Sequence, residues 1–203
     1  MTGKSNASDN RRSPMTLARL TISASLIFAM VACGSTPERA TLTNIGSNDI
    51  SIESAFSPDG SADVLVYKII DSANSTLRLA AYSFTSPGVV SRLIAAKRRG
   101  VDVQVIVDER GNMGRANTAA LNLIVNAGIP TRTISAYAIH HDKYIIADQK
   151  DVQTGSFNYS KAAAKSNSEN VVVIWNDVQL AKAFIGHWES RWQAGHPYVA
   201  KNY

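Results

Sequence analysis

Four side chains that suit phosphate chemistry occur as two matched pairs in this chain. His141 and Lys143 are two residues apart, and Ser156 and Asn158 have the same separation. In an extended segment, residues two apart lie on the same side of the backbone. A histidine can attack phosphorus, and an ammonium group can stabilise the charge that develops on phosphate oxygens. The two pairs therefore predict a site that cleaves phosphodiesters.

The second pair follows Gly155, and a glycine allows the backbone to approach a ligand closely. The hydroxyl of Ser156 and the amide of Asn158 can both donate hydrogen bonds. We expect Gly155, Ser156 and Asn158 to bind the phosphate from the side opposite Lys143.

His141 is the candidate nucleophile. Its neutral imidazole would form a phosphohistidine, which water then hydrolyses. A lone histidine is more often structural, but the matched register of the two pairs favours the catalytic interpretation. His140 does not fit the two-residue spacing, and His187 and His196 are interpreted as structural or solvated.

These residues belong to a longer pattern, H-x-K-x4-D-x6-G-S-x-N, that runs from His141 through Asp148 to Asn158. The pattern resembles the HKD signature of the phospholipase D superfamily. Flanking segments at 80–85, 99–103, 107–112 and 167–175 are similar to those of small bacterial Nuc-type endonucleases, which are EDTA-resistant and periplasmic. The similarity covers residues 50–198 and implies a phospholipase D-like α-β-α sandwich.

The resemblance also implies roles for two carboxylates. Asp148 belongs to the pattern and is a candidate site residue, although in the superfamily this aspartate is more structural than catalytic. Glu169 is implied as the partner of the histidine, because a carboxylate on the non-reacting ring nitrogen fixes the tautomer and stabilises the charged imidazole. The alternative for Glu169 is a surface charge at a strand edge. Asp108, Glu109 and Arg110 end a predicted strand and could shape the rim of the cleft.

The reaction needs one group that attacks phosphorus and another that protonates the leaving oxygen. Larger superfamily members carry two such motifs, whereas this chain carries one. The resemblance therefore implies a two-fold symmetric homodimer in which two copies of His141 share one active site. The sequence contains no recognisable metal-ligand set, such as H-x-x-x-H or a Cys/His cluster, so we expect no cofactor and activity in the presence of a chelator.

The start of the chain has the layout of a signal peptide. Three arginines precede an apolar run that ends at Ala32, immediately before the only cysteine, Cys33. Small residues before Cys33 resemble a lipobox, which implies removal of residues 1–32, a lipid on Cys33 that tethers the protein to a membrane, and export to the periplasm. Met30 departs from the usual leucine of that box. Cleavage by an ordinary signal peptidase near Ala32 or Ala40, or an uncleaved anchor, are the alternatives.

The net charge of +5 is concentrated in this leader. Residues 1–32 carry four basic side chains and one acidic side chain, a net of +3, which leaves +2 from Cys33 onward. Global charge is therefore weak evidence for nucleic-acid binding. A single cysteine also excludes an intramolecular disulfide.

Residues 33–49 are polar and predict a linker, and residues 50–203 predict a single domain. Segments with strand character alternate with segments of helical periodicity, which predicts an α/β fold with a mixed β-sheet flanked by helices on both faces. Predicted strands cover 51–56, 76–82, 101–107, 130–134, 143–147, 151–154 and 170–175, and predicted helices begin near 62, at 87, at 117 or 118 and at 178.

Taken together, the sequence predicts an exported, metal-independent endonuclease that hydrolyses single- and double-stranded DNA with little sequence preference, and RNA cleavage stays open. One alternative is a phospholipase D-type phosphodiesterase that acts on phospholipid. The sequence shows no long apolar lid or amphipathic lipid-docking helix, which favours nucleic acid. The other alternative is a non-catalytic envelope lipoprotein that binds nucleic acid, and the complete motif argues against it.

Overall fold

The computed structural model describes residues 50–58 and 60–200. The predicted signal segment 1–32, the lipidation site Cys33 and the linker 33–49 lie outside the described residues. Within the described part, no helix is long and apolar enough to cross a membrane.

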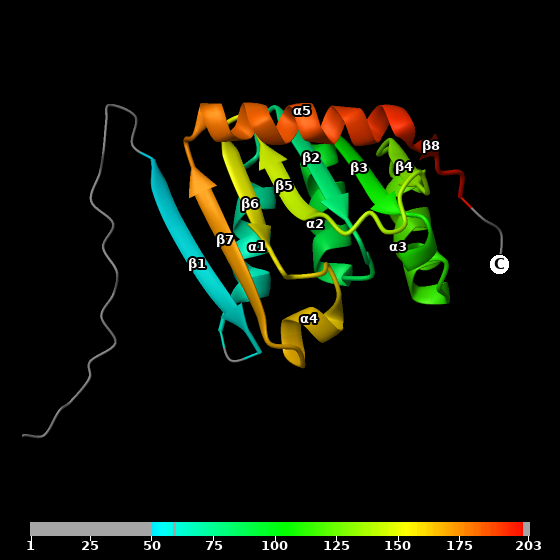
Figure 1. Cartoon of the computed structure of the whole chain (residues 1–203), viewed down its shortest axis with the longest axis horizontal. Coiled ribbons are helices and arrows are strands. Elements are labelled where there is room, and N and C mark those ends of the chain that lie inside the picture. The colour runs from blue at the N-terminus through cyan, green and yellow to red at the C-terminus, as the bar shows by residue number, and fades with distance from the viewer. Residues whose placement is uncertain (1–49, 59, 201–203) are drawn as a thin grey trace, which may run out of the picture. The chain divides into compact units, whose positions relative to one another are not determined.

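The described residues form one eight-stranded sheet in the order β1-β7-β6-β5-β2-β3-β4-β8 (Figure 1). The strands are β1 (Ser51–Ser57), β2 (Thr76–Ala81), β3 (Asp102–Asp108), β4 (Thr131–Ile134), β5 (Lys143–Ala147), β6 (Asp151–Gly155), β7 (Glu169–Trp175) and β8 (His196–Pro197). Strands β2, β3 and β4 are parallel to one another, and the other neighbouring pairs are antiparallel. The sheet is therefore mixed, as the sequence predicts.

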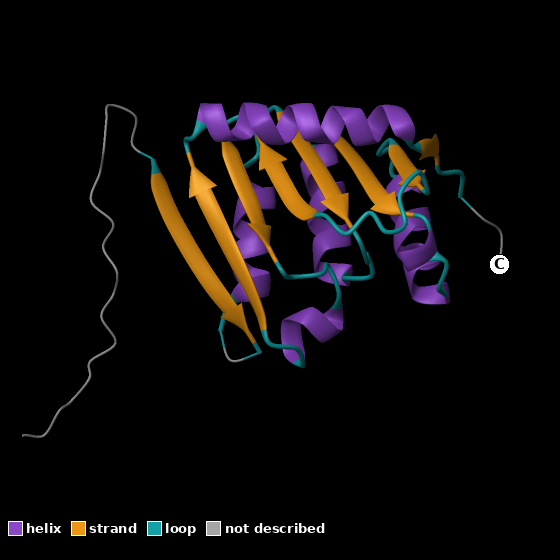
Figure 2. Cartoon of the chain, viewed as in Figure 1, coloured by secondary structure: helices purple, strands orange, loops and turns teal. Residues whose placement is uncertain are grey.

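Helices cover both faces of this sheet (Figure 2). They are α1 (Ala62–Ser72), α2 (Pro87–Arg98), α3 (Arg115–Asn126), α4 (Lys161–Lys165) and α5 (Val178–Ala194), with a short 3₁₀ turn, η1 (Arg110–Asn112). One apolar layer joins the sheet to α1, α2, α3 and α4, and a smaller layer joins the other face to α5. The predicted α/β fold with helices on both faces is confirmed.

Strand β5 lies in the middle of the sheet and is buried on both sides. Ile145 and Ala147 pack in the layer of α1 and α2, whereas Tyr144 and Ile146 pack in the layer of α5. Side chains alternate along a strand, so Lys143 shares the face of Ile145. The first residue of β5 therefore places a lysine at the edge of the larger core.

Local signals explain where several elements begin. Ser86 caps α2 by accepting a hydrogen bond from the Val89 amide, and Asp177 caps α5 in the same way from Leu180. The predicted start of α3 at Asn117 or Thr118 is wrong, because that helix begins at Arg115. The side chain of Asn117 instead donates to Oδ1 of Asn112, at 3.0 Å.

Candidate active site

His141 and Lys143 lie in contact where the chain enters β5. Lys143 is buried, with 7% of its surface exposed, and its Nζ donates to the His141 carbonyl at 2.8 Å. Tyr82, which follows β2, contacts both residues. Its ring centroid lies 4.7 Å from that of His141 and 5.5 Å from Nζ of Lys143. His141 itself is exposed, so it is accessible to a substrate.

Burial lowers the pKa of Lys143, and the nearby carboxylates of Glu169 and Asp142 oppose that shift. A poorly solvated ammonium group interacts strongly with a phosphate, because little water screens the charge. The burial of Lys143 therefore suits it to bind the anion on which His141 would act.

The serine of the second pair lies in a hydrogen-bonded group with Glu169. The Ser156 hydroxyl donates to Oε2 of Glu169 at 2.6 Å, and Nδ2 of Asn167 donates to Oε1 at 2.9 Å. The Asn170 amide donates to the Ser156 hydroxyl at 3.1 Å. In this single chain, the hydrogen bonds of Glu169 thus go to Ser156 and Asn167, and a bond to His141 is not among them.

Asn158 and Gly155 complete this side of the site. Oδ1 of Asn158 is buried and has no hydrogen-bond partner among the described residues. An unsatisfied buried acceptor is uncommon, and because a phosphate oxygen cannot donate to it, a phosphate would be bound through the Nδ2 group of Asn158. Gly155 has a φ of 151°, and a Cβ there would collide with the Asn170 carbonyl on β7. The close approach of the chain to β7 therefore requires a glycine at this position, independently of any role in substrate binding.

Asp148 lies at the opposite end of β5 from His141. It occupies the turn between β5 and β6 with a φ of 51°, and its carboxylate accepts hydrogen bonds from the backbone of Asn74, Ser75 and Thr76 at 2.7 to 3.1 Å. Partial burial opposes ionisation, but these hydrogen bonds outweigh it and lower the pKa of Asp148 to about 2. The structure separates Asp148 from the other candidate residues and connects it to the start of β2.

The three residues that end β3 have different environments. Asp108 is 3% exposed, and its carboxylate accepts the His140 amide at 2.8 Å and the Gly111 amide at 2.6 Å. Glu109 and Arg110 are exposed. Asp108 therefore holds the loop that leads into His141, and only its two neighbours are available to a cleft rim.

His187, interpreted from sequence as structural or solvated, lies beside the motif. Nε2 of His187, on α5, is 2.8 Å from Oδ2 of Asp142, and Nδ1 of His140 is 3.4 Å from the same oxygen. A cavity of about 420 Å³ opens between α5 and the ends of β5 and β6. It is lined by His141, Asp142, Lys143, Tyr144, Thr154, Gly155, Ala183, Phe184 and His187. Asp142 and His187 are 45 positions apart in sequence, which explains why no sequence pattern links them.

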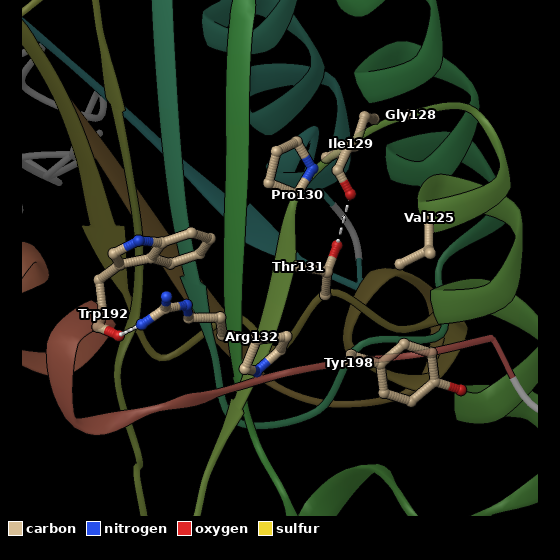
Figure 3. Close-up of a pocket in the computed structure, with 9 residues that line it drawn as sticks. Val125, Gly128, Ile129, Pro130, Thr131, Arg132, Trp192 and Tyr198 are labelled. Carbon is tan, nitrogen blue, oxygen red and sulfur yellow. Dashed lines mark hydrogen bonds between the residues drawn. The ribbon is translucent and has the colours of Figure 1, made fainter.

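A second cavity of about 420 Å³ lies at the other end of the sheet, by β4 and β8 (Figure 3). The only charged side chain that lines it, Arg132, donates to the Trp192 carbonyl at 2.6 Å. Its two hydroxyls are engaged, because Thr131 donates to the Ile129 carbonyl at 3.1 Å and Tyr198 donates to Oδ1 of Asn122 at 2.9 Å, and no histidine lines it. The candidate active site is therefore the cavity beside His141.

A metal-binding cluster is absent from the described residues. No group of three or more His, Cys, Asp or Glu side chains is gathered there as a metal site.

Comparisons with known proteins place this geometry among its relatives. A family model described as cardiolipin synthase, PLD-like domain, matches residues 66–192. A Rickettsia bellii protein named phospholipase D is 34% identical over 140 residues, which cover 69% of this chain and 68% of that protein. A Mus musculus protein named mitochondrial cardiolipin hydrolase is 31% identical over 125 residues, which cover 62% of this chain and 55% of that protein.

Two solved structures show the same fold. The phospholipase D family member Nuc from Salmonella typhimurium is 55% identical, with a TM-score of 0.73, and the match covers 74% of this chain and 99% of that one. NucT from Helicobacter pylori is 22% identical, with a TM-score of 0.66, and the match covers 74% and 100% of the two chains. The second likeness concerns the fold alone.

Proposed function

Because this chain belongs to the phospholipase D superfamily and is a phosphodiesterase of that group, we propose that it is a metal-independent endonuclease acting on DNA. The 55% identity to Nuc over 99% of that chain is the observation that carries the choice of substrate. The relatives named phospholipase D and cardiolipin hydrolase favour a phospholipid as the second candidate.

In the proposed reaction, His141 attacks the phosphorus of the scissile diester. A bond forms between an imidazole nitrogen and phosphorus, and the bond from phosphorus to the leaving oxygen breaks. Lys143 and Nδ2 of Asn158 bind the non-bridging oxygens and stabilise the charge that develops on them, and the Ser156 hydroxyl turns from Glu169 to donate to the same oxygens. Water then attacks the phosphohistidine, which releases the phosphate end of the cut strand and frees His141.

Two further roles belong to this proposal. Glu169 holds the Ser156 hydroxyl at 2.6 Å before substrate binds, and it supports the positive charge of Lys143. Protonation of the leaving oxygen comes from His141 of a second copy in a homodimer, because one chain supplies one motif histidine. Asp148 acts through the fold and takes no part in proton transfer.

The proposed export of the protein is supported by the leader sequence alone. We propose that residues 1–32 are removed, that the mature protein works in the periplasm, and that a lipid on Cys33 tethers it to a membrane. Intact-mass analysis of protein recovered from the cell envelope distinguishes the three forms. A full-length mass contradicts cleavage, and a mature mass without added lipid contradicts the tether.

The central test is degradation of plasmid DNA by the mature protein in excess EDTA. Wild-type protein is expected to cut the plasmid, and His141→Ala is expected to lose several orders of magnitude in rate while staying folded. His140 is a poor control because it is buried, so the exposed His196→Ala serves as the matched control and is expected to keep its activity.

Three outcomes of this test contradict the proposal. Activity that disappears in EDTA and returns with Mg²⁺ contradicts the phosphohistidine route. Near-normal cutting by folded His141→Ala contradicts the assigned nucleophile. Release of a headgroup from phospholipid vesicles, with DNA left intact, identifies the second candidate substrate.

A further inference from the structure

The first five residues of the loop that leads from β4 into the motif are exposed. All five residues from Ser135 to Ile139 are exposed, including two large side chains, Tyr137 at 41% and Ile139 at 55%. Exposed aromatic and aliphatic groups beside a candidate active site indicate a contact surface more often than a packing role. This segment, 135–139, is called the entry loop below.

The entry loop is held in place from both ends and from the middle. At its start, the Glu109 amide donates to the Ile134 carbonyl at 3.0 Å, and at its end the His140 amide donates to Asp108 at 2.8 Å. In between, Arg110 reaches the Ala138 carbonyl at 3.5 Å. These contacts come from the last residue of β3 and the turn that follows it, so the loop is positioned before any substrate arrives.

Two arginines from different elements converge on the entry loop. Besides Arg110 from η1, Arg191 from α5 places its guanidinium 4.8 Å from the centroid of the Tyr137 ring. A guanidinium over an aromatic ring is a favourable pair that leaves donors for other acceptors. The loop therefore combines a flat aromatic side chain with two fixed positive charges.

We propose that the entry loop, with Arg110 and Arg191, is a stacking platform for a base of single-stranded nucleic acid next to the scissile phosphate. This inference rests on the proposed function and specifies its substrate as a polynucleotide with an unpaired base. Tyr137 stacks on the base, and the two arginines contact the neighbouring phosphates. The chain from Tyr137 to His141 spans at most about 14 Å. Both residues can therefore contact the same few nucleotides of a bound nucleic-acid strand.

The physical basis is general. Proteins that bind single strands combine a cationic track with aromatic side chains, and stacking tolerates any base because each base has a π-face. A membrane is the competing partner, since Ile139 and Met113 are exposed apolar residues. However, the aromatic ring of this loop is paired with an arginine, and membrane binding by an apolar surface needs a larger continuous face than two side chains.

The test measures binding separately from cleavage. Fluorescence anisotropy with a labelled single-stranded oligonucleotide is run on His141→Ala protein, which binds without turning over. Adding Tyr137→Ala is expected to weaken binding about tenfold, while Tyr137→Phe, which keeps the ring, leaves it nearly unchanged. Arg110→Ala and Arg191→Ala are expected to weaken binding and reduce its salt dependence. Arg98→Ala, an exposed arginine at the far end of α2, is the matched control.

Kinetics on the active enzyme give the second measurement. Tyr137→Ala is expected to raise KM for single-stranded DNA about tenfold and to leave kcat and KM nearly unchanged for a strand of the same length that is abasic beside the scissile phosphate and so offers no ring to stack. Unchanged oligonucleotide binding by Tyr137→Ala overturns the inference, as does an equal loss on both substrates, which indicates a purely structural role. Loss of binding to anionic lipid vesicles, with DNA binding intact, assigns the loop to a membrane. Tight, Tyr137-dependent binding without any cleavage by the wild type supports the platform and contradicts the endonuclease.

Discussion

At the scale of single residues, the ammonium group of Lys143 has the most informative environment. It is nearly buried, yet it must carry a positive charge to bind a phosphate. Burial lowers its pKa, and two carboxylates, Glu169 and Asp142, counteract that effect. Asp142 is the residue between His141 and Lys143, and it is itself held by His187 on α5. The middle residue of the motif therefore influences the charge state of the lysine beside it.

This arrangement predicts a pH effect of Asp142→Asn. Removing the carboxylate lets the pKa of Lys143 fall further, so Lys143 loses its proton at a lower pH. The decline of kcat/KM on the alkaline side is therefore expected to move to lower pH, with a smaller change at pH 6. A pH–rate profile on DNA measures this shift. Asp71→Asn, at an exposed carboxylate paired with Arg92 away from the motif, should leave the profile in place. An unchanged alkaline limb in Asp142→Asn would contradict the role given to Asp142.

Some residues of the site are close together in sequence, and others come from distant segments that only the fold brings together. Local spacing predicts His141, Lys143, Ser156 and Asn158 as site residues, because residues two apart on an extended segment share a side. The contact between His187 and Asp142 could not be predicted, because it depends on how α5 packs over the sheet. The hydrogen bonds of Glu169 to Ser156 and Asn167 also depend on the pairing of β6 with β7. Resemblance to a family indicated that Glu169 matters, and the fold shows which groups it contacts.

At the scale of elements, β5 is fixed at both ends by an aspartate. Asp108 accepts the His140 amide at the entrance, and Asp148 accepts three backbone amides of the segment 74–76 at the exit. The Asp148 contacts connect the β5–β6 turn to the start of β2, the neighbouring strand. Both carboxylates therefore keep the motif strand in register without touching the reacting atoms.

Asp148→Asn is expected to lower stability and leave catalysis nearly intact. Asparagine tolerates the left-handed turn conformation, so the backbone is kept. The change mainly removes the negative charge of the carboxylate that accepts hydrogen bonds from three backbone amides. The folded pKa of about 2 lies below the usual value of about 3.9, so the charge stabilises the fold above about pH 4 and less as the pH falls towards 2. We expect the free energy of unfolding at pH 7 to fall by roughly 1–2 kcal/mol.

Urea unfolding at pH 7 and pH 3, with kcat measured in parallel, tests this expectation. The difference in stability between wild type and Asp148→Asn should shrink at the lower pH. A large loss of kcat in a variant of normal stability would place Asp148 in the chemistry after all.

The elements that sequence did not predict are short or depend on tertiary contacts. Helix α4 spans only Lys161–Lys165, which is too short for a hydrophobic periodicity to be recognised. Strand β8 is two residues long and exists through its pairing with Arg132 and Thr133 on β4. The longer strands and the helices α2 and α5 were predictable, because their alternation, caps and terminal glycines are local signals.

At the scale of the whole molecule, each chain supplies one motif histidine, whereas the proposed reaction needs two groups, a nucleophile and an acid for the leaving oxygen. Mixing His141→Ala chains with wild-type chains is therefore expected to reduce activity below the value for independent subunits. With equal amounts and complete exchange, about a quarter of the dimers are wild-type pairs, and only these hold two competent histidines. Native mass spectrometry must first establish that dimers form and exchange. His196→Ala chains provide the matched mixing control.

Two results would contradict the shared site. Activity at half the wild-type value or above in the exchanged mixture means that each chain works alone. Full activity in a protein that stays monomeric in native mass spectrometry has the same meaning. Either result leaves the phosphodiesterase assignment intact and requires another acid for the leaving oxygen.

The attachment of β5 at both ends has a consequence for how the protein can be observed. Amide protons in the middle of a central, doubly covered strand exchange with solvent only when the whole domain opens, whereas those of an exposed loop exchange through small local openings. We therefore expect His141 to lie at the boundary between a slowly exchanging strand and the more rapidly exchanging segment 135–139. In deuterium-exchange mass spectrometry, peptides from β5 act as a built-in reference. A substrate bound at the entry loop would slow exchange on one side of His141 and leave the other side unchanged.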